Sequence, residues 1–425
     1  MEKKKGTTAG TTSSLSSLIE ARLRKECTEQ EKQAMRRVCS WLEKRPVKSS
    51  SELIACIEST LEDARARLPE GGQVPSGPQP DLVFRFASRQ TWENISFDGT
   101  SQLNRLRRDD ASEMNEALPH GLTKMTCISY DSAKTRKTFV CMIRVMQLVL
   151  ELLKHNVHMT KRELFYTDVS LFGNQDASDH AIEHVACLLD VPRSRLNLLA
   201  SERGLVAGHV KWNEADSVVD CLQFGLTGKH VPNNVDHLTN LQTSARFILI
   251  VEDHATFTRL LSDKFIAKYS PCILITGCGS PSIAPRQFLR RLKDENPHLV
   301  VFAMVDWDVW GMEILSTYAF GSLKMSGEVE SLAVPELKWI GLHSADFATW
   351  NLPSRCFLPI SERDIAKGIA LLKRLCFNAR PFWRKEIEMM LARQVKVELQ
   401  ALSSIALSFL CEQYFAMKIQ RGDWA

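Results

Sequence analysis

Several features that mark other classes of protein are missing from this chain of 425 residues. Its twelve cysteines include no CxxC pair and follow no regular spacing, which argues against a zinc site or a disulfide framework and fits a reducing compartment. The most apolar stretch, residues 139–153, is interrupted by Arg144 and Gln147 and is too short to span a bilayer. No apolar stretch of signal-peptide length follows Met1. We therefore expect an intracellular protein that does not use a membrane.

A strong excess of charge of one sign is also missing, because the net charge is only +4. An apolar content of 44% and a charged content of 24% are typical of soluble globular proteins, and the length predicts two or three domains. A nucleic-acid partner remains compatible with this balance, since such binding needs a local basic face and not a basic whole.

The chain divides into three predicted regions. Residues 1–122 form an N-terminal tail and a helical extension, in which apolar residues recur at helical spacing from Leu15 to Leu68 and a Gly- and Pro-rich linker follows at 69–80. This extension packs either on the rest of the chain or on a second protein. Residues 123–240 contain three predicted helices, at 139–154, behind Thr160, and at about 179–189.

Apolar residues at 196–199 follow those helices, and then come a Gly-bounded stretch at 204–208 and the residues Val210 and Trp212. Three helices followed by a strand, a Gly-marked turn and a second strand are the outline of a winged helix. This pattern predicts a winged-helix domain over residues 123–240.

Residues 241–425 alternate strand and helix. Continuous apolar runs predict strands at 247–251, 272–276, 300–305 and 339–342, and helices are predicted between them and from 362 to the end. Strands that are apolar on both faces and separated by crossover helices favour a mostly parallel sheet covered on both sides.

Acidic residues end two of these strands. Glu252 follows the first, and Asp306 and Asp308 follow the third with Trp307 between them. Ligands of a parallel α/β sheet collect beyond the carboxyl ends of its strands, and side chains alternate along a strand, so the two aspartates share one side. Magnesium prefers such oxygen ligands. The alternative is a purely structural role, in which these acids only cap helices, and that role is expected of Asp253.

Tyrosine is scarce, with five in the chain, and one of them lies in the segment from Thr160 to Tyr166. Thr160 and Glu163 have capping-box spacing, so a short helix is predicted to begin at Thr160. Arg162 and Tyr166 are four residues apart and share a helix face. A guanidinium there would favour the phenolate of a group whose ordinary pKa is near ~10, or neutralise a phosphate that it attacks. The alternative is a tyrosine packed at a helix end.

Taken together, several motifs in order resemble the family that contains the eukaryotic meiotic double-strand-break transesterase and its archaeal relative, the topoisomerase VI A subunit. The resemblance covers about residues 137–419 and rests on the segments 160–166, 171–175, 277–281, 286–292, 305–308, 311–315 and 401–403. It implies a winged-helix domain that carries the nucleophile, followed by a Toprim α/β domain that binds Mg²⁺.

The same resemblance assigns roles residue by residue. It makes Tyr166 the nucleophile, Arg162 a residue that supports cleavage, and Lys161 and Arg286 DNA-binding residues, with Glu252, Asp306 and Asp308 as metal ligands. It further implies double-stranded DNA as substrate, a dimer during cleavage, and a nuclear location. No Walker motif is present in the sequence, so the ATPase-like topoisomerase VI B-type subunit is expected as a separate partner.

Two departures from the family pattern leave alternatives open. Val309 stands where the family has proline, and the loop Gly277–Ser282 lacks a lysine and an acid of the family's pattern. The favoured function is meiotic DNA breakage, against a resealing topoisomerase VI A subunit or a non-catalytic DNA-binding scaffold. His180 and His184, four apart, are expected to be packing or surface residues, and Asp346 a helix cap.

Overall fold

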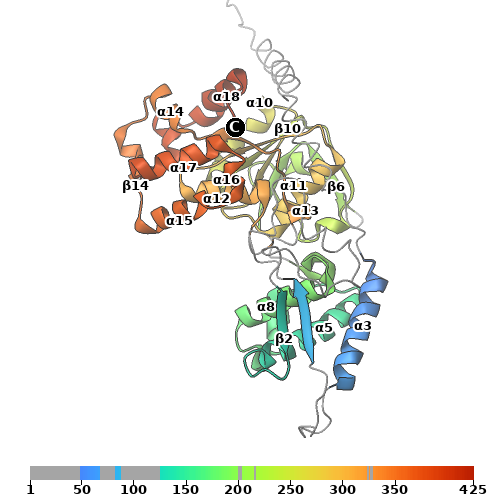
Figure 1. Ribbon diagram of the computed structural model, residues 1–425. Helices are drawn as coiled ribbons and strands as arrows, with labels where there is room; N and C mark the ends of the chain where they lie inside the picture. Colours follow the sequence, from blue (N-terminus) through green and yellow to red (C-terminus); the bar gives the residue numbers. More distant parts are fainter. Residues whose placement is uncertain are drawn as a thin grey trace, which may run out of the picture. The chain divides into compact units, whose positions relative to one another are not determined.

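The computed structural model of the protein describes residues 48–67, 82–87, 125–199, 203–214, 217–322, 325 and 329–425. These residues belong to two compact units, which divide the chain near residue 201. We call the described residues from 48 to 199 the helical unit, and those from 203 to 322 and from 331 to 425 the α/β unit (Figure 1). The predicted tail at 1–13, the predicted helices before residue 48 and the linker at 69–80 lie outside the described residues. In the described part, no helix combines the length and apolarity needed to cross a membrane.

The helical unit is built around its longest helix, α5. Figure 1 shows α5 beside α3 and α8, and both helices pack against it. Phe139 of α5 is fully buried and stacks on Phe84, with ring centroids 4.4 Å apart. The elements in chain order are α3 (Ser50–Arg67), β1 (Val83–Ala87), β2 (Met125–Ser129), α5 (Arg136–His155), β3 (Met159–Thr160), α6 (Lys161–Thr167), α7 (Val169–Phe172), α8 (Gln175–Leu189), a 3-10 helix (Arg193–Leu196) and β4 (Leu198–Leu199).

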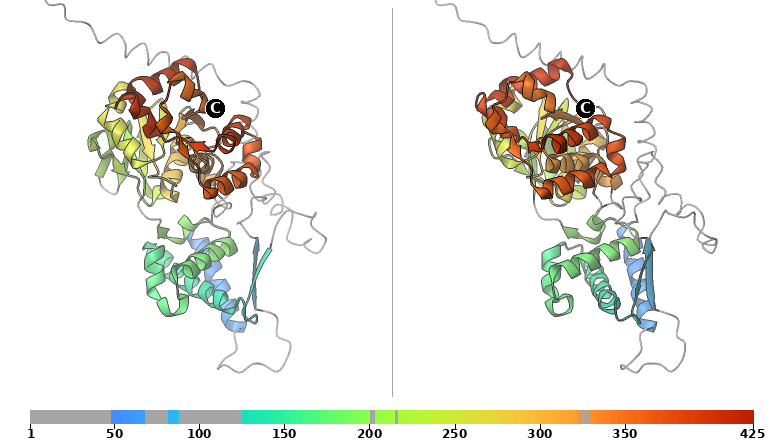
Figure 2. Two further views of the ribbon diagram at one scale, coloured as in Figure 1. Left: turned by 90° about the vertical axis from the view of Figure 1, so that its left-hand side faces the viewer. Right: turned by 60° about the vertical axis from the view of Figure 1, so that its left-hand side comes forward.

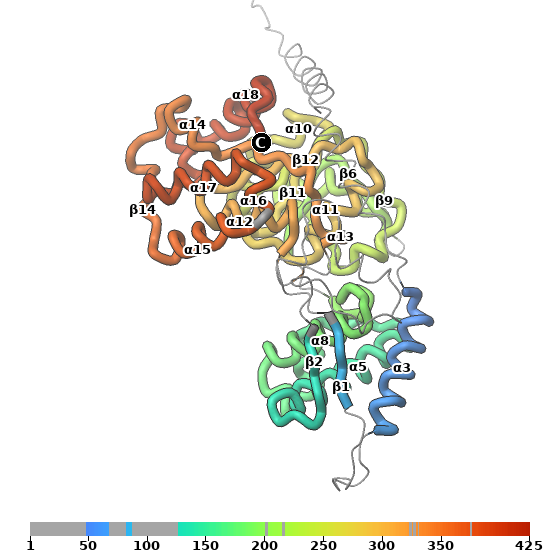
Figure 3. Tube along the Cα trace, in the orientation of Figure 1, coloured from blue at the N-terminus to red at the C-terminus, as the bar shows by residue number. Residues whose placement is uncertain are grey.

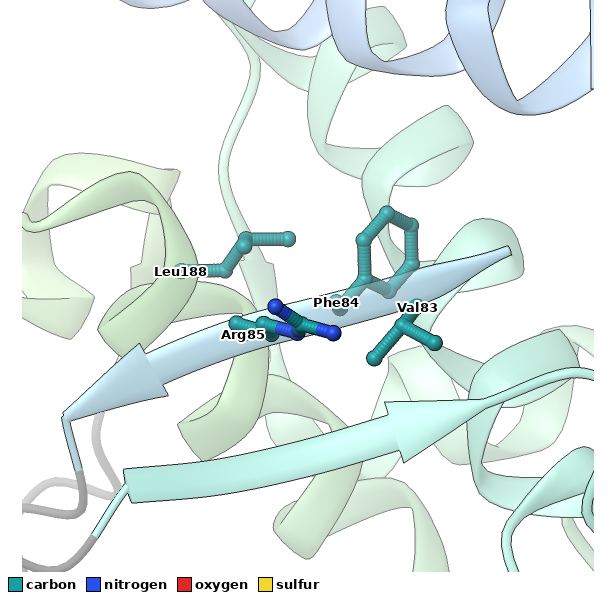
Figure 4. Close-up of a pocket in the computed structure, with 4 residues that line it drawn as sticks. All are labelled: Val83, Phe84, Arg85 and Leu188. Carbon is teal, nitrogen blue, oxygen red and sulfur yellow. The ribbon is translucent and has the colours of Figure 1, made fainter. Parts of the chain in front are cut away.

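Part of the predicted N-terminal extension is therefore an integral piece of this unit. Leu53 and Ile57 of α3 are buried in the same core as α5, so residues 50–67 pack on their own chain. Strands β1 and β2 form an antiparallel pair, with Val83 opposite Ser129 (Figure 2). A surface pocket of about 590 Å³ lies where β1 meets α8, lined by Val83, Phe84, Arg85 and Leu188 (Figure 4).

The α/β unit contains a six-stranded mixed sheet in the order β13-β12-β10-β11-β5-β8. The four predicted strands are confirmed, and they pair in parallel in the order β13-β12-β10-β11. Two of them, Phe247–Val251 and Cys272–Thr276, are buried at every position. Their bounds are β10 (Phe247–Val251), β11 (Cys272–Thr276), β12 (Val300–Met304) and β13 (Lys338–Gly341); β5 (Leu205–Gly208) and β8 (Lys229–His230) extend the sheet in antiparallel fashion.

Helices surround this sheet. Phe415 of α18 contacts both Phe247 of β10 and Phe265 of α10, so α10 and α18 cover the same face. Helices α12, α15 and α17 pack against one another (Figure 3). The helices are α9 (His254–Ser262), α10 (Phe265–Lys268), α11 (Ile283–Glu295), α12 (Val309–Phe320), α13 (Val329–Leu332), α14 (Ser344–Thr349), α15 (Glu362–Leu372), α16 (Leu375–Asn378), α17 (Pro381–Arg393) and α18 (Phe415–Arg421), and β14 (Leu358–Pro359) pairs with β15 (Val395–Lys396).

The strands predicted to complete a winged helix lie in the α/β unit instead, so the predicted boundary at 240 is wrong for them. Residues 205–208 are buried throughout and pair with β11, whereas a wing keeps one face in water. Gly208 permits this pairing, because its φ is +105° and a Cβ there would lie 2.3 Å from the carbonyl oxygen of Cys272. The following strand, β6 (Val210–Glu214), joins β7 (Ser217–Asp220) and β9 (Thr239–Thr243) in a separate three-stranded sheet.

Candidate active site

The predicted nucleophile, Tyr166, lies on the short helix α6. The predicted capping box is confirmed: the Thr160 hydroxyl accepts from the Glu163 amide at 3.1 Å, and the Glu163 carboxylate accepts from the Thr160 amide at 2.6 Å. Leu164 is fully buried and fixes the inner face of the helix, which leaves Tyr166 on the outer face with 60% of its surface exposed. Tyr166 is therefore not a core residue, and its ring contacts that of Phe165 with centroids 5.2 Å apart.

Two basic residues of the same helix were predicted to act with Tyr166. The guanidinium carbon of Arg162 lies 6.0 Å from the centroid of the Tyr166 ring, which is the outer limit of a cation–π contact. Lys161 instead forms an ion pair with Asp179 of α8. Of these two basic residues, Arg162 is therefore the one that contacts the Tyr166 ring, whereas Lys161 already has a carboxylate partner.

The predicted acids lie at the carboxyl edge of the parallel sheet. Strands β10 and β12 are neighbours with Val251 opposite Met304, which brings Glu252 next to the residues that follow β12. The Asp306 amide donates to the Glu252 carboxylate at 3.0 Å. This contact places the Glu252 carboxylate against the backbone of Asp306.

Asp306 and Asp308 point away from the residue between them, as alternation along the chain predicts. Trp307 is fully buried, and its indole nitrogen donates to Glu386 at 2.6 Å. The Asp306 carboxylate accepts from the Leu399 amide at 2.8 Å. Asp308 accepts from the Gly311 amide at 2.7 Å and is the N-cap of α12, so it has the capping role that was the alternative for these acids.

The surroundings of the three carboxyl groups make their ionisation unfavourable. Burial first, and then the neighbouring charge of Asp306, raise the pKa of Glu252 to about 9. Burial likewise raises the pKa of Asp306 to about 7, against the Leu399 hydrogen bond that lowers it. Burial also raises the pKa of Asp308. Each shift shows that negative charge here is poorly compensated, so a cation would be favoured.

The donor set suits a hard divalent ion by its chemistry. Within the described ranges, no group of three or more His, Cys, Asp or Glu side chains is close enough to hold a metal. Mg²⁺ does not require such a cage, because it usually keeps several waters and uses one or two carboxylates. Glu252 and Asp306, joined by a backbone hydrogen bond and both reluctant to ionise, would supply those two.

The other acidic residues near strand ends have structural roles. Asp253 is the N-cap of α9 and accepts from the Thr256 amide at 2.6 Å, as predicted. Asp346, predicted to cap a helix, is the N3 residue of the capping box of α14: it accepts from the amide of the N-cap residue His343 at 2.8 Å, and it also pairs with the buried Lys418 at 2.8 Å.

Arg286, predicted to contact DNA, does not reach the surface. It is only 1% exposed, because α11 lies in the interior: Phe288 of that helix packs edge-on against Trp212 of β6 at 5.4 Å. The neighbouring loop 277–281 is bound to the acidic edge, since the Gly279 amide donates to the Glu252 carbonyl at 2.8 Å. This placement does not support a DNA contact by Arg286.

One component of the edge has no signal in the sequence, the segment from Val395 to Gln400. Val397 exchanges two backbone hydrogen bonds with Trp307, at 2.8 and 3.1 Å, and the Gln400 amide group donates to Asp253 at 2.7 Å. Together with Leu399 on Asp306, these contacts bind the segment to the acidic edge. The packing residues His180 and His184 carry no such role; His184 contacts Phe86.

Comparison with known proteins places both units. Residues 247–419 match the Toprim-domain family of Spo11 and the topoisomerase 6 A subunit, while residues 137–198 match the family described as Type IIB DNA topoisomerase. The chain is 36% identical over 378 residues to Meiotic recombination protein SPO11 of Mus musculus, which covers 89% of this chain and 90% of that protein.

Two plant relatives match over a shorter span. The DNA topoisomerase 6 A subunit of Arabidopsis thaliana is 39% identical over 292 residues, or 69% of this chain and 68% of that protein. Meiotic recombination protein SPO11-1 of the same plant is 41% identical over 282 residues, or 66% of this chain and 77% of that protein. With these matches and the Toprim domain in its α/β unit, the chain belongs to the family of Spo11 and the topoisomerase 6 A subunit.

Proposed function

We propose that this protein makes DNA double-strand breaks that start meiotic recombination, with Tyr166 as the nucleophile. The observation that carries the proposal is the placement of Tyr166, exposed on a capped helix with Arg162 beside its ring. Breakage is proposed over resealing because the likeness to the mouse meiotic protein spans about nine-tenths of both chains.

The reaction is a transesterification at a backbone phosphorus. The Tyr166 oxygen forms a bond to phosphorus and loses its proton, the bond from phosphorus to the 3′-oxygen breaks, and the 3′-oxygen takes up a proton. The products are a 5′-phosphotyrosyl link and a free 3′-hydroxyl. Arg162 favours this step by placing positive charge beside the phenol and the phosphate that it attacks.

The acidic edge of the α/β unit would contribute the metal ligands of this reaction. Glu252, Asp306 and Asp308 would hold Mg²⁺, which stabilises negative charge on phosphate oxygens when it is bound. Because Asp308 is also the cap of α12, its position is fixed by the fold before any ion arrives.

The proposal includes partners that the chemistry needs. Two strands must be cut to break a duplex, so two copies of Tyr166 act in a dimer on double-stranded DNA. A topoisomerase VI B-type subunit would supply ATP-driven closure, and the work on chromosomal DNA places the protein in the nucleus. The helical unit, whose helices α5, α6 and α8 precede β4, would act as the winged-helix domain with a different wing from the one predicted.

Replacement of Tyr166 by Phe tests the assignment most directly. We expect Tyr166→Phe to bind duplex DNA normally and to form no covalent protein–DNA product, measured by denaturing capture of end-labelled DNA. Tyr130→Phe is the matched control, because Tyr130 lies in the same unit with its ring against Phe139 and should leave the product unchanged. Covalent product that persists in Tyr166→Phe and disappears in Tyr130→Phe would contradict the proposal.

The two alternatives predict different results. A resealing topoisomerase would separate interlinked circles when supplied with ATP and a B-type subunit, whereas the break-forming enzyme would leave covalent ends. A non-catalytic scaffold would give no covalent product even as the wild-type protein in Mg²⁺, and that outcome would end the proposal.

A further inference from the structure

A second pocket lies beside the acidic edge of the α/β unit. It has a volume of about 470 Å³ and is lined by Trp310, Pro359, Ser361, Arg363, Asp364 and Lys396. Trp310 is two residues after Asp308, on the first turn of α12. Lys396 directly precedes Val397, whose backbone exchanges hydrogen bonds at 2.8 and 3.1 Å with Trp307, the residue before Asp308. The pocket is therefore a direct neighbour of the predicted metal ligands.

The wall of this pocket combines an aromatic ring with cations. The guanidinium carbon of Arg363 lies 5.2 Å from the Trp310 ring centroid, and the Lys367 ammonium lies 5.1 Å from it. Lys367 is already paired with Glu313. Across the described part of the chain, no ion pair within 4.0 Å is found for Arg363 or Lys396, so these two are the cations available to a ligand.

Asp364 does not cancel this positive character. Its carboxylate is occupied by hydrogen bonds, accepting from the Trp310 indole at 2.7 Å and from the Ser361 amide and hydroxyl at 2.9 Å each. These bonds fix the Trp310 ring and the start of α15. Two cations, Arg363 and Lys396, against one carboxylate leave the lining with a net charge of +1.

We propose that this pocket, which we call the Trp310 pocket, binds a phosphodiester group of the DNA backbone next to the phosphate that is cut. The inference rests on the proposed function, since it takes the acidic edge as the place where the scissile phosphate meets the metal. An anion suits the Trp310 pocket because Arg363 offers a planar set of donors and Lys396 a point charge. Trp310 is only two residues from Asp308, so a phosphate in this pocket would belong to the same DNA strand as the phosphate that is cut.

The role of Lys396 in this arrangement is to separate two negative groups. A duplex that approaches Glu252, Asp306 and Asp308 brings phosphates toward carboxylates, and repulsion follows unless a cation lies between them. Lys396 lies near Asp308 on one side and lines the Trp310 pocket on the other. It would therefore lower the cost of placing the DNA strand along this edge.

The test measures how duplex binding depends on salt, in full-length protein that also carries Tyr166→Phe so that no covalent product forms. The association constant K for duplex DNA falls as salt rises, and each phosphate contact that is lost should make the slope of log K against log salt less steep by about 0.9. The loss of affinity relative to the parent protein should therefore be roughly eightfold greater at about 0.1 M salt than at about 1 M. We expect this change in Arg363→Gln with Lys396→Gln. Lys385→Gln, an exposed cation of α17 outside the pocket lining, is the matched control and should keep the original slope.

Two outcomes would overturn the inference, and they differ from failure of the proposed function. A double variant with the slope and affinity of Lys385→Gln would show that no phosphate binds in the Trp310 pocket. An equal loss in Lys385→Gln would show a diffuse charge effect instead of a site. Failure of the proposed function has another signature, the absence of covalent product from the protein with Tyr166 intact.

Discussion

Gly311 lies where the two halves of the acidic edge touch, so its replacement by Ala gives a sharp test of the metal site. A Cβ at this position would lie 2.5 Å from the Asp306 carbonyl oxygen and 3.1 Å from a carboxylate oxygen of Glu252. The first contact is with backbone and cannot be relieved by turning a side chain. We expect Gly311→Ala to push the start of α12 away from Asp306. The hydrogen bond from the Asp306 amide to the Glu252 carboxylate should then break.

The effect on stability should be small, because two terms oppose each other. Alanine is favoured over glycine inside a helix by about 1 kcal/mol. Overpacking of a tight site costs about 1–3 kcal/mol. The free energy of unfolding should therefore fall by at most about 2 kcal/mol. Loss of metal affinity should be the larger effect, since two of the three predicted ligands, Glu252 and Asp306, are displaced.

Urea unfolding with and without Mg²⁺ separates these two effects. A ligand that binds only the folded state at about 100 times its Kd adds about 2.7 kcal/mol to the free energy of unfolding. A tenfold loss of affinity removes about 1.4 kcal/mol of that gain. We expect Gly311→Ala to lose at least about 1.4 kcal/mol of the Mg²⁺-dependent gain in the free energy of unfolding. This gain is the difference between the free energies of unfolding measured with and without Mg²⁺.

The control is Gly368→Ala in α15. Its Cβ would meet the end of the Leu391 side chain at 2.8 Å, and that flexible group can turn aside. Gly368→Ala should keep the full Mg²⁺-dependent gain. If Gly311→Ala keeps it too, Glu252 and Asp306 do not bind the ion in the way proposed.

Three further predictions follow from the same contacts. Thr160→Ala removes the cap of α6 and should cost about 1 kcal/mol locally, seen as faster amide exchange in that helix with less covalent product. Lys418→Met removes the cation paired with the buried Asp346 and should lower the free energy of unfolding by about 3–5 kcal/mol in urea. Burial raises the pKa of Glu252 to about 9 and of Asp306 to about 7, so the folded protein without metal binds more protons than the unfolded chain above about pH 4. Its stability should fall as pH rises toward 9 while Mg²⁺ affinity rises, which calorimetric titration at about pH 6 and about pH 9 would measure; equal affinities would refute this.

The central strands could be predicted almost to the residue, because burial on both faces leaves an unbroken apolar run. The residues 247–251 and 272–276 have no polar side chain before the final Thr276, and each is one strand. The capping box at Thr160 was equally readable, since its partners are three residues apart. Both patterns involve residues that are close together in the sequence, and both predicted the local structure correctly.

Pairings between distant segments could not be read in the same way. The stretch 205–208 is a strand, but only its partner β11, far along the chain at 272–276, decides that it belongs to the α/β sheet. The hydrogen bond from Leu399 to Asp306 joins residues 93 apart and uses a backbone amide, which no side-chain pattern reveals. Arg286 has a basic side chain on an amphipathic helix, yet it is buried, and its charge lies beside Tyr318 of α12.

The raised pKa values of the acids give the site a property that a fully ionised site would lack. Burial holds the pKa of Glu252 and of Asp306 well above their ordinary values, so both carboxyls resist ionisation at neutral pH. A cation that binds must displace their protons, so part of its binding energy is spent on ionising the site. In the proposed site, DNA phosphates would add ligands to a Mg²⁺ ion held by these carboxyls and would offset that cost, because Mg²⁺ binds phosphate oxygens together with few carboxylates. Metal and DNA should therefore bind cooperatively, and the site should hold its ion firmly only when a strand is in place to be cut.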